Sequence, residues 1–177
     1  YATPFYFAAA ISFVNAGLLW LLFNETFTTT VRSKIKLHRA IEIFISAFRH
    51  PEICYLSVIL LVMIFGWSSF YSFISMFLLR KFNFDPIHVA LYMGLMGGGF
   101  GLGTGVIVKY CTKYFSLKKN VIVALAIAAL ASLMTVCAPS PIFVWLSVIP
   151  VSIAMAVAYS VLLTIFSNQV DEDSQGW

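Results

Sequence analysis

The stretch NETFTTTVRSKIKLHRAIEIFISAFRHPE, residues 24–52, decides how this chain is organised. It is the one long polar segment in an otherwise apolar sequence, and its basic side chains outnumber its acidic ones. Its basic residues are Arg32, Lys34, Lys36, Arg39 and Arg49, and its acidic residues are Glu25, Glu42 and Glu52. Lysine and arginine beside apolar segments stay on the cytoplasmic side of a bilayer, because carrying them across during insertion is costly. We therefore expect residues 24–52 to be cytoplasmic and to orient the neighbouring helices.

The second part of this stretch has the pattern of an amphipathic helix. Its apolar side chains recur at helical spacing, at Leu37, Ile41, Phe44, Ile45 and Phe48, and most of its charged residues fall elsewhere around the axis. Such a basic amphipathic helix suits the headgroup layer of a membrane or the inner face of a partner.

The composition is that of a membrane protein. Hydrophobic residues make up 61% of the chain, charged residues only 10%, and the mean hydropathy is +0.94. The basic residues lie in the connections instead of sharing a face with aromatic residues, so we expect no nucleic-acid partner. The sequence has no CxxC pair, phosphate-binding glycine loop, HExxH motif or intramembrane Ser/His or Asp/Asp pair. It therefore predicts no cofactor, no metal site and no enzyme.

Apolar stretches long enough to cross the hydrocarbon, which takes about 20 residues, occur five times. They cover residues 4–23, 53–79, 87–108, 121–138 and 142–166. The predicted fold class is an all-α membrane protein, a partial helical bundle with five transmembrane helices and a cytoplasmic amphipathic linker helix. Loop 109–120 carries Lys109, Lys113, Lys118 and Lys119 without an acid, so it is expected to be cytoplasmic, as is the tail 168–177.

The second predicted span places polar and aromatic groups at mid-depth. Its middle reads FGWSSFYSF over residues 65–73, and Trp67 and Tyr71 lie four residues apart on one helical face. Hydroxyls and an indole at this depth are better satisfied by neighbouring helices or by a water-filled cavity than by lipid. Ordinary packing between helices and the lining of a substrate cavity both remain open for this face.

The third predicted span is unusually rich in glycine. Gly97, Gly101 and Gly105 are spaced four apart, as are Gly94 and Gly98. In a bilayer such spacing lets another helix approach to backbone contact. Static packing is the favoured interpretation, and a sliding or bending surface in a moving protein is compatible with it.

No charged residue falls in the middle of any predicted span. Proton-coupled carriers usually need a buried ionisable group. Either the protein does not couple to protons, or the proton-carrying residue lies in a part of a longer protein that this sequence lacks.

In several successive pieces the sequence resembles the major facilitator superfamily, most closely its multidrug and tetracycline type of drug:proton antiporter. Residues 23–26, FNET, are similar to the end of the sixth family helix, which commonly reads Pro-Glu-Thr, with Asn24 in the proline's place. The basic segment resembles the linker between the two six-helix halves, the span with Trp67 and Tyr71 the seventh helix, and the glycine-rich span the eighth. Residues 168–176, NQVDEDSQG, resemble the turn between the tenth and eleventh helices. One departure is that Gly105 is followed by lysines without the family's acid.

The resemblance implies a fragment covering about the sixth to tenth helices. Residues 1–23 would be the last helix of the N-terminal half, 24–52 the linker, and 53–177 the C-terminal half. Such a carrier, monomeric when full length and located in the bacterial inner membrane, would bind a small molecule between its halves and rock to expose it alternately to each side. Protons would be the coupling ion, carried by an acid in the missing half, and membrane lipid would surround the bundle. The implied substrate contacts are Trp67, Tyr71, Met96, Met155 and Tyr159.

Two other functions fit the same features. A carrier of the same fold could import a defined metabolite, although an anionic one would usually require an intramembrane cation. A multi-span protein that scaffolds others and transports nothing is also compatible with an odd number of spans and no buried charge.

Overall fold

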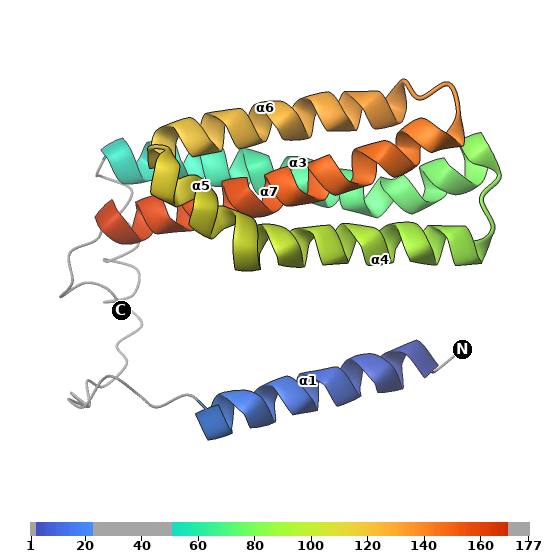
Figure 1. Ribbon diagram of the computed structural model, residues 1–177, viewed down its shortest axis with the longest axis horizontal. Helices are drawn as coiled ribbons and strands as arrows, with labels where there is room; N and C mark the ends of the chain where they lie inside the picture. Colours follow the sequence, from blue (N-terminus) through green and yellow to red (C-terminus); the bar gives the residue numbers. More distant parts are fainter. Residues whose placement is uncertain (1–2, 23–50, 170–177) are drawn as a thin grey trace. The chain divides into compact units, whose positions relative to one another are not determined.

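The computed structural model describes residues 3–22 and 51–169 (Figure 1). These residues form α-helices and one short π-helix, and no strand occurs among them. The chain divides into two compact units, Tyr1–Leu37 and His38–Trp177, and each is described by itself. The predicted amphipathic helix and nearly all of the segment 24–52 lie outside the described residues, as does the tail beyond Gln169.

The described part of the first unit is a single helix, α1, which spans Thr3–Leu22. It coincides with the first predicted span, residues 4–23, to within one residue at each end. Ser12 donates its hydroxyl to the carbonyl of Ala8 at 2.9 Å, which satisfies this polar group inside an apolar helix.

The second unit is a bundle of long helices joined by short turns. Its elements are α3 (Pro51–Phe82), α4 (Pro86–Leu102), the π-helix η1 (Gly103–Ile107), α5 (Val108–Tyr114), α6 (Leu117–Val136) and α7 (Pro141–Gln169). Four helical stretches are long and apolar enough to cross a membrane: Ile53–Phe82, Pro86–Tyr114, Leu117–Val136 and Pro141–Gln169. They match the second to fifth predicted spans and confirm the predicted all-α membrane fold.

The main difference from the predicted boundaries lies after the third span. We expected that span to end at Val108, but helix continues through η1 and α5 to Tyr114. The segment 109–120 is therefore mostly helical and turns only at residues 115–116. Lys109 and Lys113 can continue a helix at the membrane edge because long basic side chains reach the headgroup layer while their stems stay apolar.

The turn between α3 and α4 is set by its local sequence. Asn83 adopts a positive φ of 52°, a conformation that asparagine tolerates better than most residues. Asp85 then caps α4, because its side chain accepts a hydrogen bond of 2.8 Å from the backbone N–H of His88. Pro86 follows as the first helical residue, where its missing N–H costs nothing.

Helix α7 is the centre of the bundle. In its most apolar stretch 56% of the residues are buried, against 6% in α3. Helices α3, α4 and α6 all pack against it, with α6 and α4 on opposite sides of it in Figure 1. Small residues of α6 at Ala124, Ala128 and Ala131 are buried and let α6 approach α7 closely.

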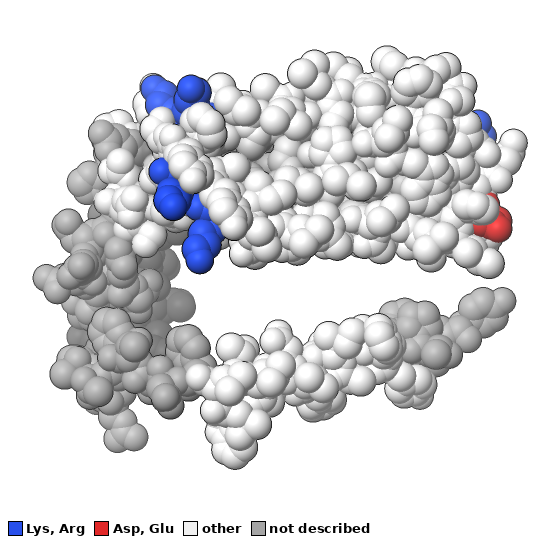
Figure 2. All heavy atoms as spheres, viewed as in Figure 1, with Lys and Arg blue, Asp and Glu red and all other residues white. Residues whose placement is uncertain are grey.

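Within residues 53–169, the charged residues of this unit lie at its two ends. Arg80, Lys81 and Asp85 surround the turn between α3 and α4, which we call the Asp85 end. The opposite end, here the lysine end, carries Lys109, Lys113, Lys118 and Lys119. Figure 2 shows basic side chains at both ends and none along the middle of the face that it displays. This is the distribution that a bilayer requires of a spanning bundle.

Candidate functional site

The middle of α3 carries a group of ring contacts that we call the aromatic face: Trp67, Phe70 and Tyr71 of α3 with Phe100 of α4. The Trp67 ring stacks on Phe70, with centroids 5.9 Å apart, and on Phe100 of the neighbouring helix at 6.3 Å. The Tyr71 ring lies 6.5 Å from Trp67 and is tilted by 42°. Aromatic pairs at these separations attract each other beyond simple burial. The aromatic face therefore holds its rings in a defined arrangement.

Within this face, Trp67 and Tyr71 have different surroundings. Trp67 is half-buried and packs against both hydrophobic clusters of the bundle. Tyr71 is 52% exposed, so most of its ring and hydroxyl is available to a neighbour outside the unit. Trp67 thus supports the bundle, and Tyr71 extends the same face outward.

The structure brings together only part of the predicted substrate set. Met96 and Met155 are buried, one in each of the two clusters against which Trp67 packs. Tyr159 is partly exposed on α7, and Trp67 and Tyr71 are the two members whose rings are in contact. Spacing along the sequence could not separate buried methionines from lining ones, because both recur at helical intervals.

Two helices approach closely at Gly99 and Gly103, which the spacing of the glycines did not mark as a pair. A methyl group added to Gly99 would lie 2.1 Å from Ser152 Oγ, and one added to Gly103 would lie 2.6 Å from the Ala156 Cβ. Gly99 and Gly103 are one turn apart on α4 and η1, as are Ser152 and Ala156 on α7. We call these four residues the glycine seam. It is a small-residue contact of the kind that holds membrane helices together.

The glycines predicted for packing or gating lie elsewhere around the same helix. A methyl group added to any of them would meet nothing within 4 Å; they are Gly94, Gly97, Gly98, Gly101 and Gly105. In this unit they leave open backbone surface instead of contacting α7. The pair of small residues Ser152 and Ala156, spaced four apart on α7, is the signal that could have pointed to Gly99 and Gly103.

The glycine seam continues into the π-helix η1, Gly103–Ile107. Thr104 donates its hydroxyl to the carbonyls of Phe100 and Gly101, both at 3.1 Å, next to this change in helical winding. A π-helical turn is a common departure from regular helix at functional positions. It gives the span Pro86–Tyr114 a local irregularity where that helix meets α7.

Buried hydroxyls tie α6 to α7 deeper in the bundle. Thr135 and Ser147 are fully buried, and their hydroxyl oxygens lie 2.6 Å apart. One of the two hydroxyls donates to the other, and the hydroxyl that accepts donates its own hydrogen to a backbone carbonyl. That carbonyl is Ala131 for Thr135, at 3.0 Å, or Val144 for Ser147, at 2.9 Å. Such a satisfied polar pair fixes the position of one helix relative to another inside an apolar core.

The Asp85 end is closed by rings and by a lysine. Phe84 stacks on Trp145 with centroids 5.8 Å apart, and His88 lies 6.4 Å from the same indole. Lys81 donates to the carbonyl of Val136 at 2.7 Å, which joins the end of α3 to the end of α6. Hydrogen bonds from the backbone N–H and the ring of His88 hold the pKa of Asp85 below its ordinary value.

These features contain no evident place for a metal. Within residues 3–22 and 51–169, no three His, Cys, Asp or Glu side chains lie close enough to share an ion. What the described geometry offers is an uncharged aromatic face, a close helix contact and a local irregularity in winding.

Comparison with known proteins places these features in one family. The family model of the Major Facilitator Superfamily matches residues 1–176. Neither the curated proteins nor the solved structures contain a match. The members of this family are transporters of small molecules that sit in membranes, and the four apolar helices agree with that setting. The chain belongs to the Major Facilitator Superfamily and is an integral membrane protein of the transporter class.

Proposed function

We propose that the protein is a secondary active transporter that exports drugs or other amphiphilic small molecules in exchange for protons, by alternating access. The observation that carries this proposal is the aromatic face of α3, where rings and hydroxyls gather at the middle of a membrane helix without a charge. Soft, repackable apolar surfaces suit ligands of varied shape. An anionic metabolite would instead favour a fixed cation at this depth.

In this proposal the chain spans two parts of the transporter. Residues 1–23 are the last helix of the N-terminal half, 24–52 the linker, and 53–177 the C-terminal half. The substrate binds between the halves. Tyr71 supplies the exposed ring that contacts it, and Trp67 holds the Tyr71 ring in place. The other proposed contacts are Met96, Met155 and Tyr159. Because both methionines are buried in the clusters behind Trp67, they would reach substrate only when the helices shift.

The glycine-rich helix supplies the surface for that movement. The open glycines, Gly94, Gly97, Gly98, Gly101 and Gly105, present backbone on which a helix of the other half could slide. The glycine seam holds the same helix against α7, and the π-helix η1 between α4 and α5 is where it would bend. Packing on one face and gating on another are therefore assigned to the same helix.

Proton coupling is assigned to the N-terminal half. The charged residues of α3 to α7 lie at the ends of the bundle, where they can exchange with water but cannot carry a proton through the core. The lysine end, together with residues 24–52 and 168–177, is assigned to the cytoplasm, since segment 109–120 carries four lysines and no acid. The proposed location is the bacterial inner membrane, with the full-length protein a monomer.

A transport assay on the full-length protein in sealed vesicles tests this proposal. Fluorescent amphiphilic cations and neutral drugs are compared with sugars and organic acids, with an imposed proton gradient and after its collapse by a protonophore. We expect several unrelated amphiphiles to move against the direction of proton flow, and this movement to stop when the gradient collapses. Transport of a single sugar or organic acid, or flux that is indifferent to the gradient, would replace the proposal with a defined metabolite carrier.

A further inference from the structure

A hollow of the described bundle lies between η1, α5, α6 and α7, away from the aromatic face. It has a volume of about 420 Å³. We call it the lysine-end groove. The residues that line it are Ile107, Cys111, Phe115, Lys119, Asn120, Val123, Ala124, Ile127, Ile149, Pro150, Ile153, Ala154 and Val157. All but two of them, Lys119 and Asn120, are apolar residues, cysteine or proline, and Lys119 is the one charged member.

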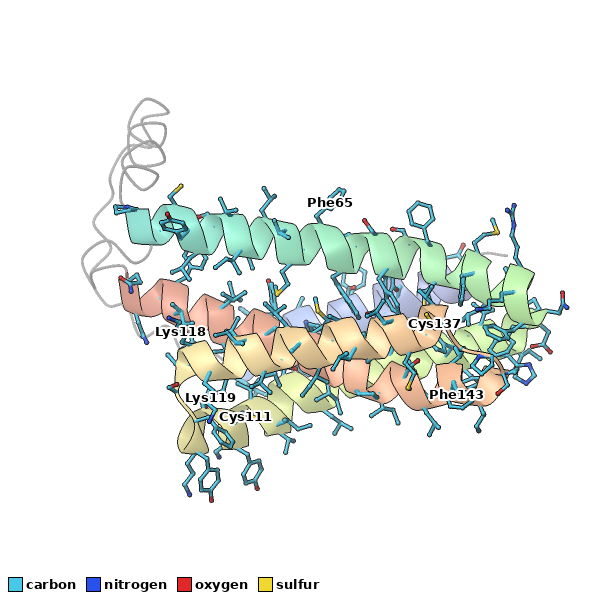
Figure 3. The ribbon with its side chains drawn as sticks, turned by 90° about the horizontal axis from the view of Figure 1, so that it is seen from above. Phe65, Cys111, Lys118, Lys119, Cys137 and Phe143 are labelled. Carbon is cyan, nitrogen blue, oxygen red and sulfur yellow. The ribbon has the colours of Figure 1, made fainter. Side chains whose placement is uncertain are left out.

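The charge of the groove lies at the lysine end of the bundle, in Lys119. Lys119 Nζ lies over the Phe115 ring, 5.3 Å from its centroid, so the ammonium group is held beside another residue of the groove lining. Lys118 precedes it in the chain, and Figure 3 shows Lys118, Lys119 and Cys111 at the same end of the bundle. Asn120 is buried and donates its amide to the carbonyl of Phe115 at 3.3 Å, which fixes the turn that carries the lysines.

The remainder of the groove is apolar and extends along the first half of α6 and the middle of α7. Val123 and Ile127 line it from α6, while Ile149 and Ile153 line it from α7. An apolar hollow with a cation at one end matches a molecule that has a hydrocarbon chain and an anionic head. Basic pockets between membrane helices at one face of the bilayer bind anionic lipid headgroups for this reason.

We propose that the lysine-end groove binds an anionic glycerophospholipid, with one acyl chain between α6 and α7 and the phosphate against Lys119. The proposal rests on the membrane setting and on the described groove, and it does not depend on the transported substrate or on proton coupling. The lipid would lie against the side of η1 and α5 that carries Ile107 and Cys111. It would thus brace the irregular part of the span Pro86–Tyr114 against α7.

Photocrosslinking of the full-length protein tests this. A benzophenone amino acid replaces Val123, which lines the groove but is 47% exposed and so tolerates a larger ring. The protein is reconstituted in equal parts of phosphatidylglycerol and phosphatidylcholine, irradiated, and its adducts are weighed by mass spectrometry. Because the two lipids are supplied equally, unselective contact would give equal amounts of the two adducts. We expect clearly more phosphatidylglycerol adduct than phosphatidylcholine adduct.

Two lysine variants then locate the headgroup. K119Q should lower the ratio of phosphatidylglycerol to phosphatidylcholine adducts about fivefold, because one lysine near an anionic surface strengthens binding by about that factor. K118Q removes the same charge from the neighbouring residue, which does not line the groove, and should leave most of the preference intact. Thermal unfolding of both variants beside the parent checks that each is folded.

Three results would overturn the proposal. Adducts in proportion to the supplied lipids would mean that the groove does not select an anionic head. An equal effect of K119Q and K118Q would mean diffuse attraction to the membrane surface instead of a site. A crosslink to a peptide of the same chain or of a second copy would mean that protein, and not lipid, fills the groove.

Discussion

The glycine seam makes the sharpest prediction about how this bundle is held together. The perturbation is Gly103→Ala, which adds one methyl group at the contact between η1 and α7. That methyl would lie 2.6 Å from the Ala156 Cβ and 3.1 Å from the backbone oxygen of Ile153. Neither atom is the end of a flexible side chain, so the helices themselves must separate.

The magnitude follows from the size of the clash. Carbon atoms in contact prefer a separation of about 3.5–4.0 Å, so the helices must part by about 1 Å. Overpacking of this kind costs about 1–3 kcal/mol. Replacing glycine by alanine in a helix returns about 1 kcal/mol. We therefore expect Gly103→Ala to lower the free energy of unfolding by up to about 2 kcal/mol, and to be about 1–3 kcal/mol less stable than the same substitution at a glycine without a neighbour.

The same helix supplies a matched control. A methyl group at Gly101 meets nothing within 4 Å, so Gly101→Ala should leave stability unchanged or raise it by up to about 1 kcal/mol. Adding Ala156→Gly to Gly103→Ala removes the closest contact and should recover part of the loss. The two changes should therefore be coupled in a double-mutant cycle.

The assay is equilibrium unfolding of the full-length protein in mixed micelles with increasing dodecyl sulfate, followed by helical circular dichroism. The four proteins of the cycle are compared with Gly101→Ala in the same micelles. If Gly103→Ala is as stable as Gly101→Ala, or if the cycle shows no coupling, the described contact between η1 and α7 is not the one that the protein uses.

Three further results are expected. Tyr71→Ala should reduce transport about 2- to 10-fold, which is what the loss of one aromatic contact with substrate costs. Phe65→Ala, on the same helix but with a side chain that points away from the bundle (Figure 3), should leave transport unchanged. Both are measured as efflux at matched expression. Thr135→Val keeps the shape of the side chain but removes its hydrogen bond to Ser147, so the same unfolding assay should show a loss of about 1 kcal/mol, and no loss would mean that the pair is not formed. Because folding lowers the pKa of Asp85, its carboxylate should contribute fully to stability above the ordinary value of 3.8, and this contribution should fade as the pH falls through the lower, folded value. Asp85→Asn should remove this part of the acid sensitivity of unfolding. An unchanged pH profile of unfolding in Asp85→Asn would contradict the prediction.

The membrane fold could be predicted from the sequence because hydropathy and length decide which helices cross a bilayer. The second to fifth predicted spans match described helices, and the boundaries differ by a few residues at most ends. The exception, the continuation of helix to Tyr114, arises because lysines at 109 and 113 mark the membrane edge without ending a helix. The run of lysines therefore did not predict where the helix turns.

The internal contacts could not be predicted in the same way. Glycines at 94, 97, 98, 99, 101, 103 and 105 offer several faces of one helix, and spacing alone does not say which face a partner covers. The choice of Gly99 and Gly103 depends on small residues at 152 and 156 of α7, far away in the chain. Likewise, burial of Met96 and Met155 depends on which helices surround them, and that is a property of the bundle.

The central claim of this account is that the face of α3 around Tyr71 binds substrate and opens to water. The most direct test is Tyr71→Cys in full-length protein whose own cysteines, including Cys54, Cys111 and Cys137, have been replaced. Its reaction with a membrane-impermeant maleimide is measured in sealed vesicles, with and without a transported amphiphile. The account predicts that the thiol reacts and that the amphiphile slows the reaction. A thiol that does not react from either side, or whose reaction is unaffected by every transported compound, would show that this face contacts lipid or another helix instead.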